Sequence, residues 1–207
     1  MTHTLTGVRP PDDRPAVDAA LITAAALRLF AEWGYRSTTM SDIGKAIGVR
    51  GPSLYKHVRS KQSLLLDIML DTMHALIRDQ TAAKGSAADP DKQLRLMVEA
   101  HVRYHATHRE QAFVGNRELG NLDPENRAVI LELRSTYERL LRKVITDGVQ
   151  AGIFVAPSVR LTSYAILDMG MGVATWFRAT GEHSADQVAK IYANYAWQML
   201  RRESEIG

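Results

Sequence analysis

Between residues 36 and 61 the chain carries positive charge with almost no compensation. The basic residues of this stretch are Arg36, Lys45, Arg50, Lys56, Arg59 and Lys61, and its only acid is Asp42. Lysine and arginine neutralise phosphates, and in a major groove they bond guanine O6 and N7. The net charge of the whole chain is only +3, so the clustering of charge is what indicates a DNA partner.

A second group of polar side chains lies in the middle of the chain. His101, Tyr104, His105 and His108 are spaced i, i+3, i+4 and i+7, so a helix would present them on one face. Two histidines four residues apart can share a zinc ion, but no acidic ligand has a suitable spacing on that face. We therefore expect pocket polarity or interhelical hydrogen bonds here, with no metal site and no cofactor.

Signals for catalysis and for membranes are missing from the sequence. It contains no GxSxG elbow, P-loop, dinucleotide glycine fingerprint or HExxH motif, so an enzyme would have to use the histidine face. With no cysteine there is no disulfide framework, thiolate zinc site or cysteine nucleophile. No apolar run approaches the roughly 18 residues of a membrane span, and the first residues lack a signal-peptide core. We expect a cytoplasmic protein that is not an enzyme and has no membrane partner.

Helical periodicity explains how these side chains are positioned. Apolar residues recur at helical spacing, capping signals precede several of these segments, and no segment shows sustained strand alternation. We expect helices over about residues 15–33, 40–47, 51–58, 61–83, from 90, 108–119, 124–152, 157–179 and 185–202. The fold class is therefore all-α with about nine helices, and Trp33 is expected on the inward face of the first one.

The chain divides into three parts on this reading. Residues 1–14 are expected to be a flexible arm, whose Arg9 and Arg14 are solvated charges or contacts to the minor groove or phosphates. Residues 15–59 form a three-helix helix–turn–helix domain. Residues 60–207 form a longer helical bundle, and its first helix already runs well beyond the basic module.

The helix–turn–helix signal is specific in its details. Thr39 and Asp42 are spaced as a capping box, and Gly48 ends the helix that they begin. Arg50 stands where the next helix needs a cap. It is either a structural compromise or a direct reader of DNA, and we favour the reader.

Several spaced motifs of this region resemble the N-terminal domain of TetR-family transcriptional regulators. They are ALRLFAEWGY at 26–35, TTMSDI at 38–43, Gly48-Val49, SLYKH at 53–57 and Ser60-Lys61. The resemblance covers about residues 17–68. Two departures stand out, since the family usually has Ser or Thr at Arg50 and Phe at Val58.

The resemblance implies a homodimeric repressor that places one recognition helix per protomer in a palindromic double-stranded operator. Base edges are expected to meet Arg50, Pro52, Ser53 and Lys56, with Gly51 also facing outward. Tyr55 and His57 match family positions that touch the DNA backbone, although Tyr55 can also pack internally. Thr39 and Lys61, at helix N-termini, suit phosphates. The sequence does not distinguish repression from activation.

The resemblance also implies a small-molecule effector that releases the DNA. Trp176-Phe177-Arg178 before a capped last helix resembles members that respond to acyl-CoA or lipid-derived ligands. The resemblance assigns effector binding and dimerisation to residues 60–207. Residues expected to line the pocket are Met97, His101, Tyr104, His105, Phe113, Tyr137, Met169, Met171 and Trp176, with Arg117 and Arg178 for an anionic group.

The resemblance also implies dimerisation through the last two helices, and an apolar stripe fits this role. The last helix carries an apolar stripe of Val188, Ile191, Tyr192, Tyr195 and Met199. Each glycine of Gly170-Met171-Gly172 costs a helix roughly 1 kcal/mol relative to alanine. Close helix approach at the dimer interface, to which we assign Gly172, or room for a ligand would explain them.

Overall fold

The structure, a computed structural model, describes residues 18–201. The arm expected over residues 1–14, with Arg9 and Arg14, lies outside this range, as do residues 202–207. The described residues form nine α-helices, one short 3₁₀ helix and no strand, which confirms the all-α fold class. In chain order the helices are α1 Ala19–Trp33, α2 Met40–Ala46, α3 Gly51–Leu54, α4 Lys61–Gly85, α5 Pro90–Thr107, α6 Arg109–Arg117, η1 Leu119–Asn121, α7 Pro124–Gln150, α8 Val159–Trp176 and α9 Ala185–Gln198.

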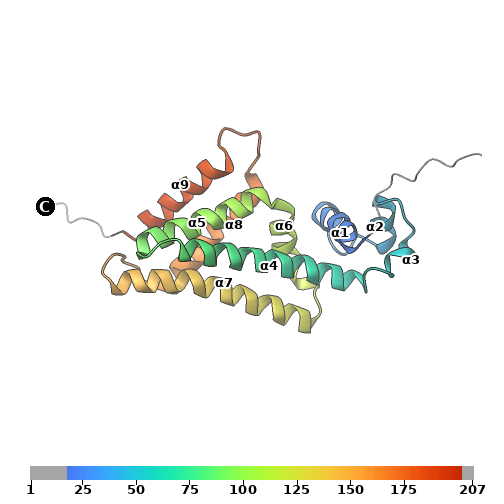
Figure 1. The fold of residues 1–207 in the computed structure, drawn as a ribbon, viewed down its shortest axis with the longest axis horizontal. Coiled ribbons are helices and arrows are strands. Elements are labelled where there is room, and N and C mark those ends of the chain that lie inside the picture. Colours follow the sequence, from blue (N-terminus) through green and yellow to red (C-terminus); the bar gives the residue numbers. More distant parts are fainter. Residues whose placement is uncertain (1–17, 202–207) are drawn as a thin grey trace, which may run out of the picture.

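The molecule is elongated, with α1–α3 at one end and the remaining helices at the other (Figure 1). The long helix α4 starts beside the small module and continues into the larger bundle. Within that bundle α5 is central, because it packs against α4, α7, α8 and α9. None of the helices in residues 18–201 is long and apolar enough to cross a membrane.

Capping side chains set most of the helix starts. Thr39, Ser60, Asp89, Asp123 and Ser184 each accept a hydrogen bond from a backbone N–H of the first helical turn. Such a bond satisfies one of the donors that a helix leaves unpaired at its N-terminus. These starts agree with the sequence-based expectation.

Other boundaries differ from that expectation. The first helix begins at Ala19 rather than at residue 15, because Asp18 Oδ1 accepts from Leu21 N at 2.8 Å. Ser158 likewise caps α8, which therefore starts at Val159 and not at residue 157. The largest difference is α3, which is only four residues long. Arg50 supplies no side-chain cap for α3, and beyond Leu54 the chain continues as a turn in which His57 N bonds Leu54 O at 2.9 Å.

The small module has its own apolar core. Ile22, Ala26 and Phe30 of α1 pack with Ile43 and Leu54, and all five are fully buried. Trp33, expected on this inward face, is 50% exposed at the end of α1, so that expectation was wrong.

Two glycines allow α2 and α3 to approach closely. A Cβ at Gly44 would lie 2.8 Å from the carbonyl oxygen of Val49, and one at Gly51 would lie 3.2 Å from Ser41 Cα. Backbone atoms cannot move aside easily, so larger residues would separate the two helices. Gly48, in the turn between them, has a φ of +75° that favours glycine.

Candidate functional site

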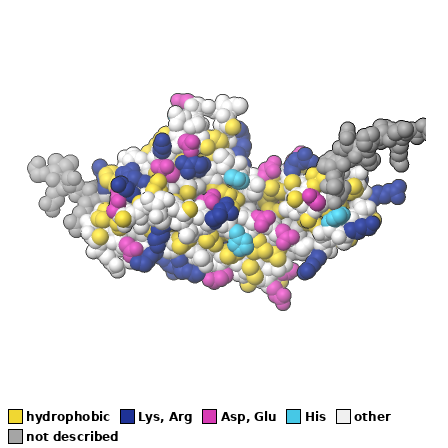
Figure 2. Space-filling view, in the orientation of Figure 1, with side chains coloured by type: hydrophobic (Ala, Val, Ile, Leu, Met, Phe, Trp, Pro, Cys, Tyr) yellow, Lys and Arg dark blue, Asp and Glu magenta, His cyan; other side chains and the backbone are white. Residues whose placement is uncertain are grey.

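The side chains expected to meet DNA lie on one exposed face of the small module. Pro52, Ser53, Tyr55, Lys56 and His57 are all exposed on α3 and the turn that follows it. Arg50, directly before α3, is exposed as well. In Figure 2 several Lys and Arg side chains gather over this end of the molecule. The structure therefore brings these expected contact residues together.

Gly51 has to be removed from this set. It is buried, since its Cα faces Ser41 at the α2–α3 crossing. It serves the close approach of the two helices and does not face outward as expected.

The cationic and imidazole groups of this face have no bonding partners within the described residues. Among the described residues, the side chains of Arg50, Lys56 and His57 make no hydrogen bond or ion pair. Exposed donors without internal partners are available to phosphates and base edges.

Lys61 and Thr39 differ from Arg50, Lys56 and His57, because their side chains bond to other groups of the protein. Lys61 Nζ donates to the carbonyl oxygens of Tyr35 at 2.9 Å and Thr38 at 2.8 Å, and it lies 4.2 Å from the centroid of the Tyr35 ring. Partial burial lowers the pKa of Lys61. Thr39 Oγ1 donates to the Asp42 carboxylate at 2.5 Å and accepts from Asp42 N at 3.2 Å. Lys61 thus connects the start of α4 to the loop between α1 and α2.

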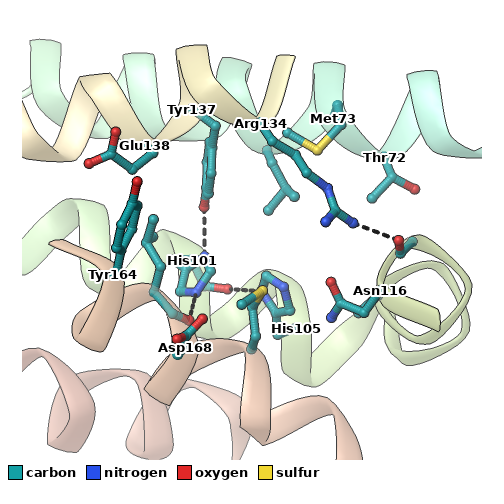
Figure 3. Close-up of a pocket in the computed structure, with 15 residues that line it drawn as sticks. Thr72, Met73, His101, His105, Asn116, Arg134, Tyr137, Glu138, Tyr164 and Asp168 are labelled. Carbon is teal, nitrogen blue, oxygen red and sulfur yellow. Dashed lines mark hydrogen bonds between the residues drawn. The ribbon is translucent and has the colours of Figure 1, made fainter. Parts of the chain in front are cut away.

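The larger bundle encloses a cavity of about 210 Å³ between α4, α5, α6, α7 and α8 (Figure 3). Of the residues expected in the pocket, His101, His105 and Tyr137 line it, together with Met171. The lining residues that sequence reasoning missed are Thr72, Met73, Leu76, Ala112, Gly115, Asn116, Arg134, Glu138, Tyr164, Leu167 and Asp168.

His101 is the centre of a buried hydrogen-bond chain in the cavity wall. Its Nε2 lies 2.9 Å from Leu167 O and its Nδ1 lies 2.6 Å from the Tyr137 hydroxyl. A carbonyl oxygen only accepts, so Nε2 carries the proton and Nδ1 accepts from Tyr137. Burial, together with neighbouring His105, lowers the pKa of His101 well below its usual value, and burial raises the pKa of Tyr137. Both groups are therefore neutral, and they join α5, α7 and α8.

Gly170 makes room for this histidine. A Cβ at Gly170 would lie 2.6 Å from His101 Nε2 and would overlap the ring. The compensation for a glycine inside α8 is thus space for a wall residue of the cavity. Gly172 is different, because a Cβ there would meet nothing within 4 Å in this chain.

The four residues of the predicted histidine face have different environments along α5. His105 donates its Nδ1–H to the carbonyl oxygen of His101 at 2.9 Å, and burial lowers the pKa of His105. His108 is exposed and stacks on Tyr104, with ring centroids 4.4 Å apart. Tyr104 is buried and lines a separate groove between α1 and α4. No group of three or more His, Cys, Asp or Glu residues in the described chain is arranged to hold a metal ion.

The remaining expected pocket residues lie away from the cavity. Met97 is fully buried in the core, and Met169 is a half-buried residue packed against that core. Phe113 carries the guanidinium of Arg117 over its ring, 4.7 Å from the centroid. Trp176 is 50% exposed. Arg178 is exposed, and its Nη1 donates to Phe177 O at 3.0 Å.

One signal in the sequence could have revealed a missed residue. The inward stripe of α7 contains Ile130, Tyr137 and Leu141, and Arg134 falls at the helical spacing within it. An arginine in an apolar stripe indicates a polar feature beneath the helix. In the structure its Nη2 donates to Gly115 O at 2.6 Å.

The cavity is also connected to the DNA-binding module through α6 and η1. Arg36 Nε donates to Asn121 Oδ1 at 2.7 Å, and Gln62 Nε2 donates to Asn121 O at 2.5 Å. Asn121 Nδ2 in turn donates to the buried carboxylate of Glu118. The segment that carries Gly115 and Asn116 at the cavity thus ends in hydrogen bonds to residues of the loop after α1 and of α4.

The expected dimer face is partly exposed. Ile191 and Tyr195 of α9 and Met199, which follows its last residue, are 37–49% exposed, and Tyr192 is half-buried. On α8, Leu161 is 66% exposed. Val188, however, is only 3% exposed and belongs to the core of this chain, so it is removed from the expected interface.

A basic helix–turn–helix joined by one long helix to a bundle with an internal cavity defines a class of ligand-responsive DNA-binding regulator. Comparison with family models agrees with this class. Residues 22–68 match the model described as bacterial regulatory proteins, tetR family, and residues 87–200 match the tetracyclin repressor-like C-terminal domain. The chain belongs to the tetR family of transcriptional regulators.

Individual relatives cover most of the chain. It is 29% identical over 169 residues to the HTH-type transcriptional repressor KstR2 of Rhodococcus jostii strain RHA1, covering 81% of this chain and 83% of that protein. The crystal structure of a tetR-family regulator from Rhodococcus RHA1 has a TM-score of 0.84 at 31% identity, covering 90% of this chain and 98% of that one. AibR in complex with isovaleryl coenzyme A and operator DNA has a TM-score of 0.78 at 22% identity, covering 85% and 96%, and at this identity shares the fold alone.

Proposed function

We propose that this regulator is a homodimeric repressor that binds a palindromic operator and leaves it when a small, apolar or acyl-CoA-like effector enters the cavity. The observation that carries the proposal is the course of α4. Its first residue, Lys61, bonds the loop between α1 and α2, and Thr72, Met73 and Leu76 of the same helix line the cavity. A change in the cavity therefore acts directly on the helix that positions the DNA-binding module.

On the DNA side, Arg50, Ser53 and Lys56 are proposed to read base edges, with Pro52 packed close to them in the groove. Arginine and lysine suit guanine, and serine accepts or donates to either base type. Tyr55 and His57 are proposed to contact the DNA backbone. Thr39 and Lys61 contribute through the helix N-termini that they occupy, because each already uses side-chain groups internally.

Dimerisation is proposed through α8 and α9. Exposed large apolar side chains on both helices, among them Leu161, Tyr195 and Met199, would be covered by the same surface of a second copy. Gly172, where a Cβ meets nothing in this chain, would allow the partner's helix to approach closely. Two recognition elements related by a two-fold axis match a palindromic site.

Two routes are available for the signal. Displacement of α4 would move Lys61 and change the separation of the two recognition helices. Displacement of α6 would act through Asn121 on Arg36 and Gln62. In both cases the effector acts only to the extent that it binds one arrangement more tightly than the other.

The proposed class of effector follows from the cavity and the relatives. The wall is largely apolar around His101, His105 and Tyr137, and AibR with the same fold is described with isovaleryl coenzyme A. About 210 Å³ holds the acyl portion of such a molecule, since a 150 Å³ cavity holds about one benzene ring. The cavity is partly open to solvent, so the coenzyme A portion would extend out of it.

A mobility-shift titration tests this function. Genomic DNA fragments selected on the protein would supply the operator, and acyl-CoA esters of increasing chain length would be added to the complex. We expect a discrete shifted species of dimer stoichiometry that disappears with at least one ester. Failure to select any specific fragment would contradict DNA binding, and a stable complex in every ester would contradict an acyl-CoA-like effector.

A further inference from the structure

We infer that the cavity contains a built anion site at Arg134, so that its ligand is a small carboxylate with an apolar tail. This inference rests on the proposed function and narrows it, because within the small apolar effectors proposed for the cavity it selects a free carboxylate in place of an acyl-CoA thioester. Neither the helical pattern nor the relatives assign a ligand-binding role to Arg134.

Arg134 points from α7 into the cavity (Figure 3). Its guanidinium has five N–H donors, and the structure records one hydrogen bond from it, Nη2 to Gly115 O at 2.6 Å. It is half-buried, and burial lowers its pKa. A permanently charged group in an apolar wall is unfavourable unless a counter-charge or further acceptors compensate it.

The structure supplies no such counter-charge. Among the described residues no carboxylate lies within ion-pair distance of Arg134. Glu138, one turn along α7, is engaged elsewhere, because it pairs with Arg142 at 3.2 Å and accepts from Ser163 Oγ at 2.5 Å. In Figure 3 the carboxylate of Glu138 points away from Arg134 on the far side of Tyr137, and Asp168 lies on the facing helix α8. A ligand anion would complete the site.

The surroundings of Arg134 define the rest of the ligand. Asn116 lies on the same side of the cavity and can donate a second hydrogen bond from its amide. A guanidinium binds a carboxylate through two parallel hydrogen bonds, which gives specificity for that planar group. Met73, Leu76 and Leu167 form apolar wall for the tail.

The volume sets the size of the tail. About 210 Å³ is moderately more than the roughly 150 Å³ that encloses a benzene ring, so the enclosed space fits one ring or a short branched chain plus a carboxylate. A multi-ring ligand would have to extend out of the cavity.

Occupation of this site would also affect α6. A carboxylate that draws the guanidinium away weakens its bond to Gly115 O, which is the side-chain bond from α7 to α6 beside the cavity. The far end of the same segment holds Arg36 and Gln62 through Asn121. The segment formed by α6 and η1 therefore connects the Arg134 site to the DNA-binding module.

Calorimetric titration of the full-length protein tests the anion site with matched pairs of probes. Benzoate, 3-methylbutanoate and hexanoate would each be compared with the amide of the same carbon skeleton. We expect at least one carboxylate to bind ten-fold or more tightly than its amide. In Arg134→Gln that preference should disappear while the amide affinity stays unchanged, and Arg134→Lys should retain part of it.

Arg139→Gln is the matched control. Arg139 is on the same helix but exposed, and it pairs with Glu132 at 2.9 Å, so its loss should leave the preference unchanged. Carboxylates that bind no better than amides, or a preference that survives Arg134→Gln, would overturn the anion site.

Operator binding measured with the same probes separates this inference from the proposed function. Carboxylates that bind through Arg134 without releasing DNA would contradict the ligand-responsive repressor and leave the anion site standing. Neutral esters that release DNA with no carboxylate preference would contradict the anion site alone.

Discussion

The DNA face and the cavity use their polar residues in opposite ways. Around α3, the side chains of Arg50, Lys56 and His57 are exposed and make no side-chain bond to the described part of the chain. Around the cavity, His101 and Tyr137 are 2% and 6% exposed and bond each other at 2.6 Å. The groups proposed to read DNA are therefore not needed for packing, whereas the cavity wall is part of the core. Substitutions around α3 should change operator affinity and leave the free energy of unfolding unchanged. Substitutions in the cavity wall should change both ligand binding and the free energy of unfolding.

The largest effect is expected at Gly170. Gly170→Ala would force the His101 ring from its place and break its bonds to Tyr137 and Leu167. Overpacking with loss of buried hydrogen bonds should lower the free energy of unfolding by about 2–4 kcal/mol. Urea denaturation measures this change. Gly85→Ala at the end of α4, where no described atom lies within 4 Å of the added Cβ, is the control and should stay within about 1 kcal/mol of the parent. Equal losses in both variants would contradict the placement of His101.

Removing one tyrosine hydroxyl from each region compares their effects on stability. Tyr137→Phe removes the donor to His101 Nδ1 and leaves a buried acceptor unpaired, which should cost about 1–3 kcal/mol of unfolding free energy. Tyr55→Phe removes an exposed hydroxyl and should change stability by less than about 0.5 kcal/mol while weakening operator binding. Thermal unfolding and fluorescence anisotropy on operator DNA report the two quantities. A loss of stability in Tyr55→Phe as large as in Tyr137→Phe would remove the contrast.

Lys56→Ala tests the DNA face by itself. Loss of a base contact should weaken operator binding by about 1–3 kcal/mol and relax sequence preference, with stability unchanged within about 0.5 kcal/mol. Lys45→Ala on α2 removes the same charge from a side chain that is 76% exposed and lies 3.8 Å from Asp42. We expect a smaller loss of affinity from Lys45→Ala, without any change of preference. The reverse order of the two variants would place the recognition surface on α2.

Acidification should act on the cavity through its histidines. Folded-state pKa values of His101 and His105 are lowered from 6.5, so below pH 6.5 the unfolded chain binds protons that the folded chain does not. The free energy of unfolding should be level above about pH 7. It should fall as the pH drops below 6.5, by up to about 1.4 kcal/mol per pH unit for each histidine. Urea denaturation at pH 7.5 and 5.5 measures this, and equal values at the two pH values would contradict buried neutral histidines.

The same contrast explains what could be predicted from sequence. The DNA-binding module is a contiguous stretch, so capping by Thr39 and the spacing of Ile43 and Leu54 predicted which side chains turn outward. Helix starts at Pro90 and Pro124 followed from local caps. The length of α3 was less predictable, because α3 begins at Gly51 as expected but ends at Leu54, where the chain continues as a turn.

The cavity could be predicted only in part. Its wall combines residues from Thr72 to Met171 on five helices, and periodicity does not say which helical faces meet. His101, His105 and Tyr137 were predicted at the pocket, but Phe113 and Trp176 look equally suitable in the sequence and lie elsewhere. Gly170 shows the limit most directly, since its role depends on a histidine about 70 residues earlier in the chain.

Occupation of the cavity is proposed to control the affinity of the protein for its operator. The most direct measurement is fluorescence anisotropy of labelled operator DNA titrated with the protein, without and with a saturating ligand whose binding depends on Arg134. We expect at least a ten-fold rise in the dissociation constant for DNA when the ligand is bound. An unchanged dissociation constant, with ligand bound in the cavity by calorimetry, would contradict it.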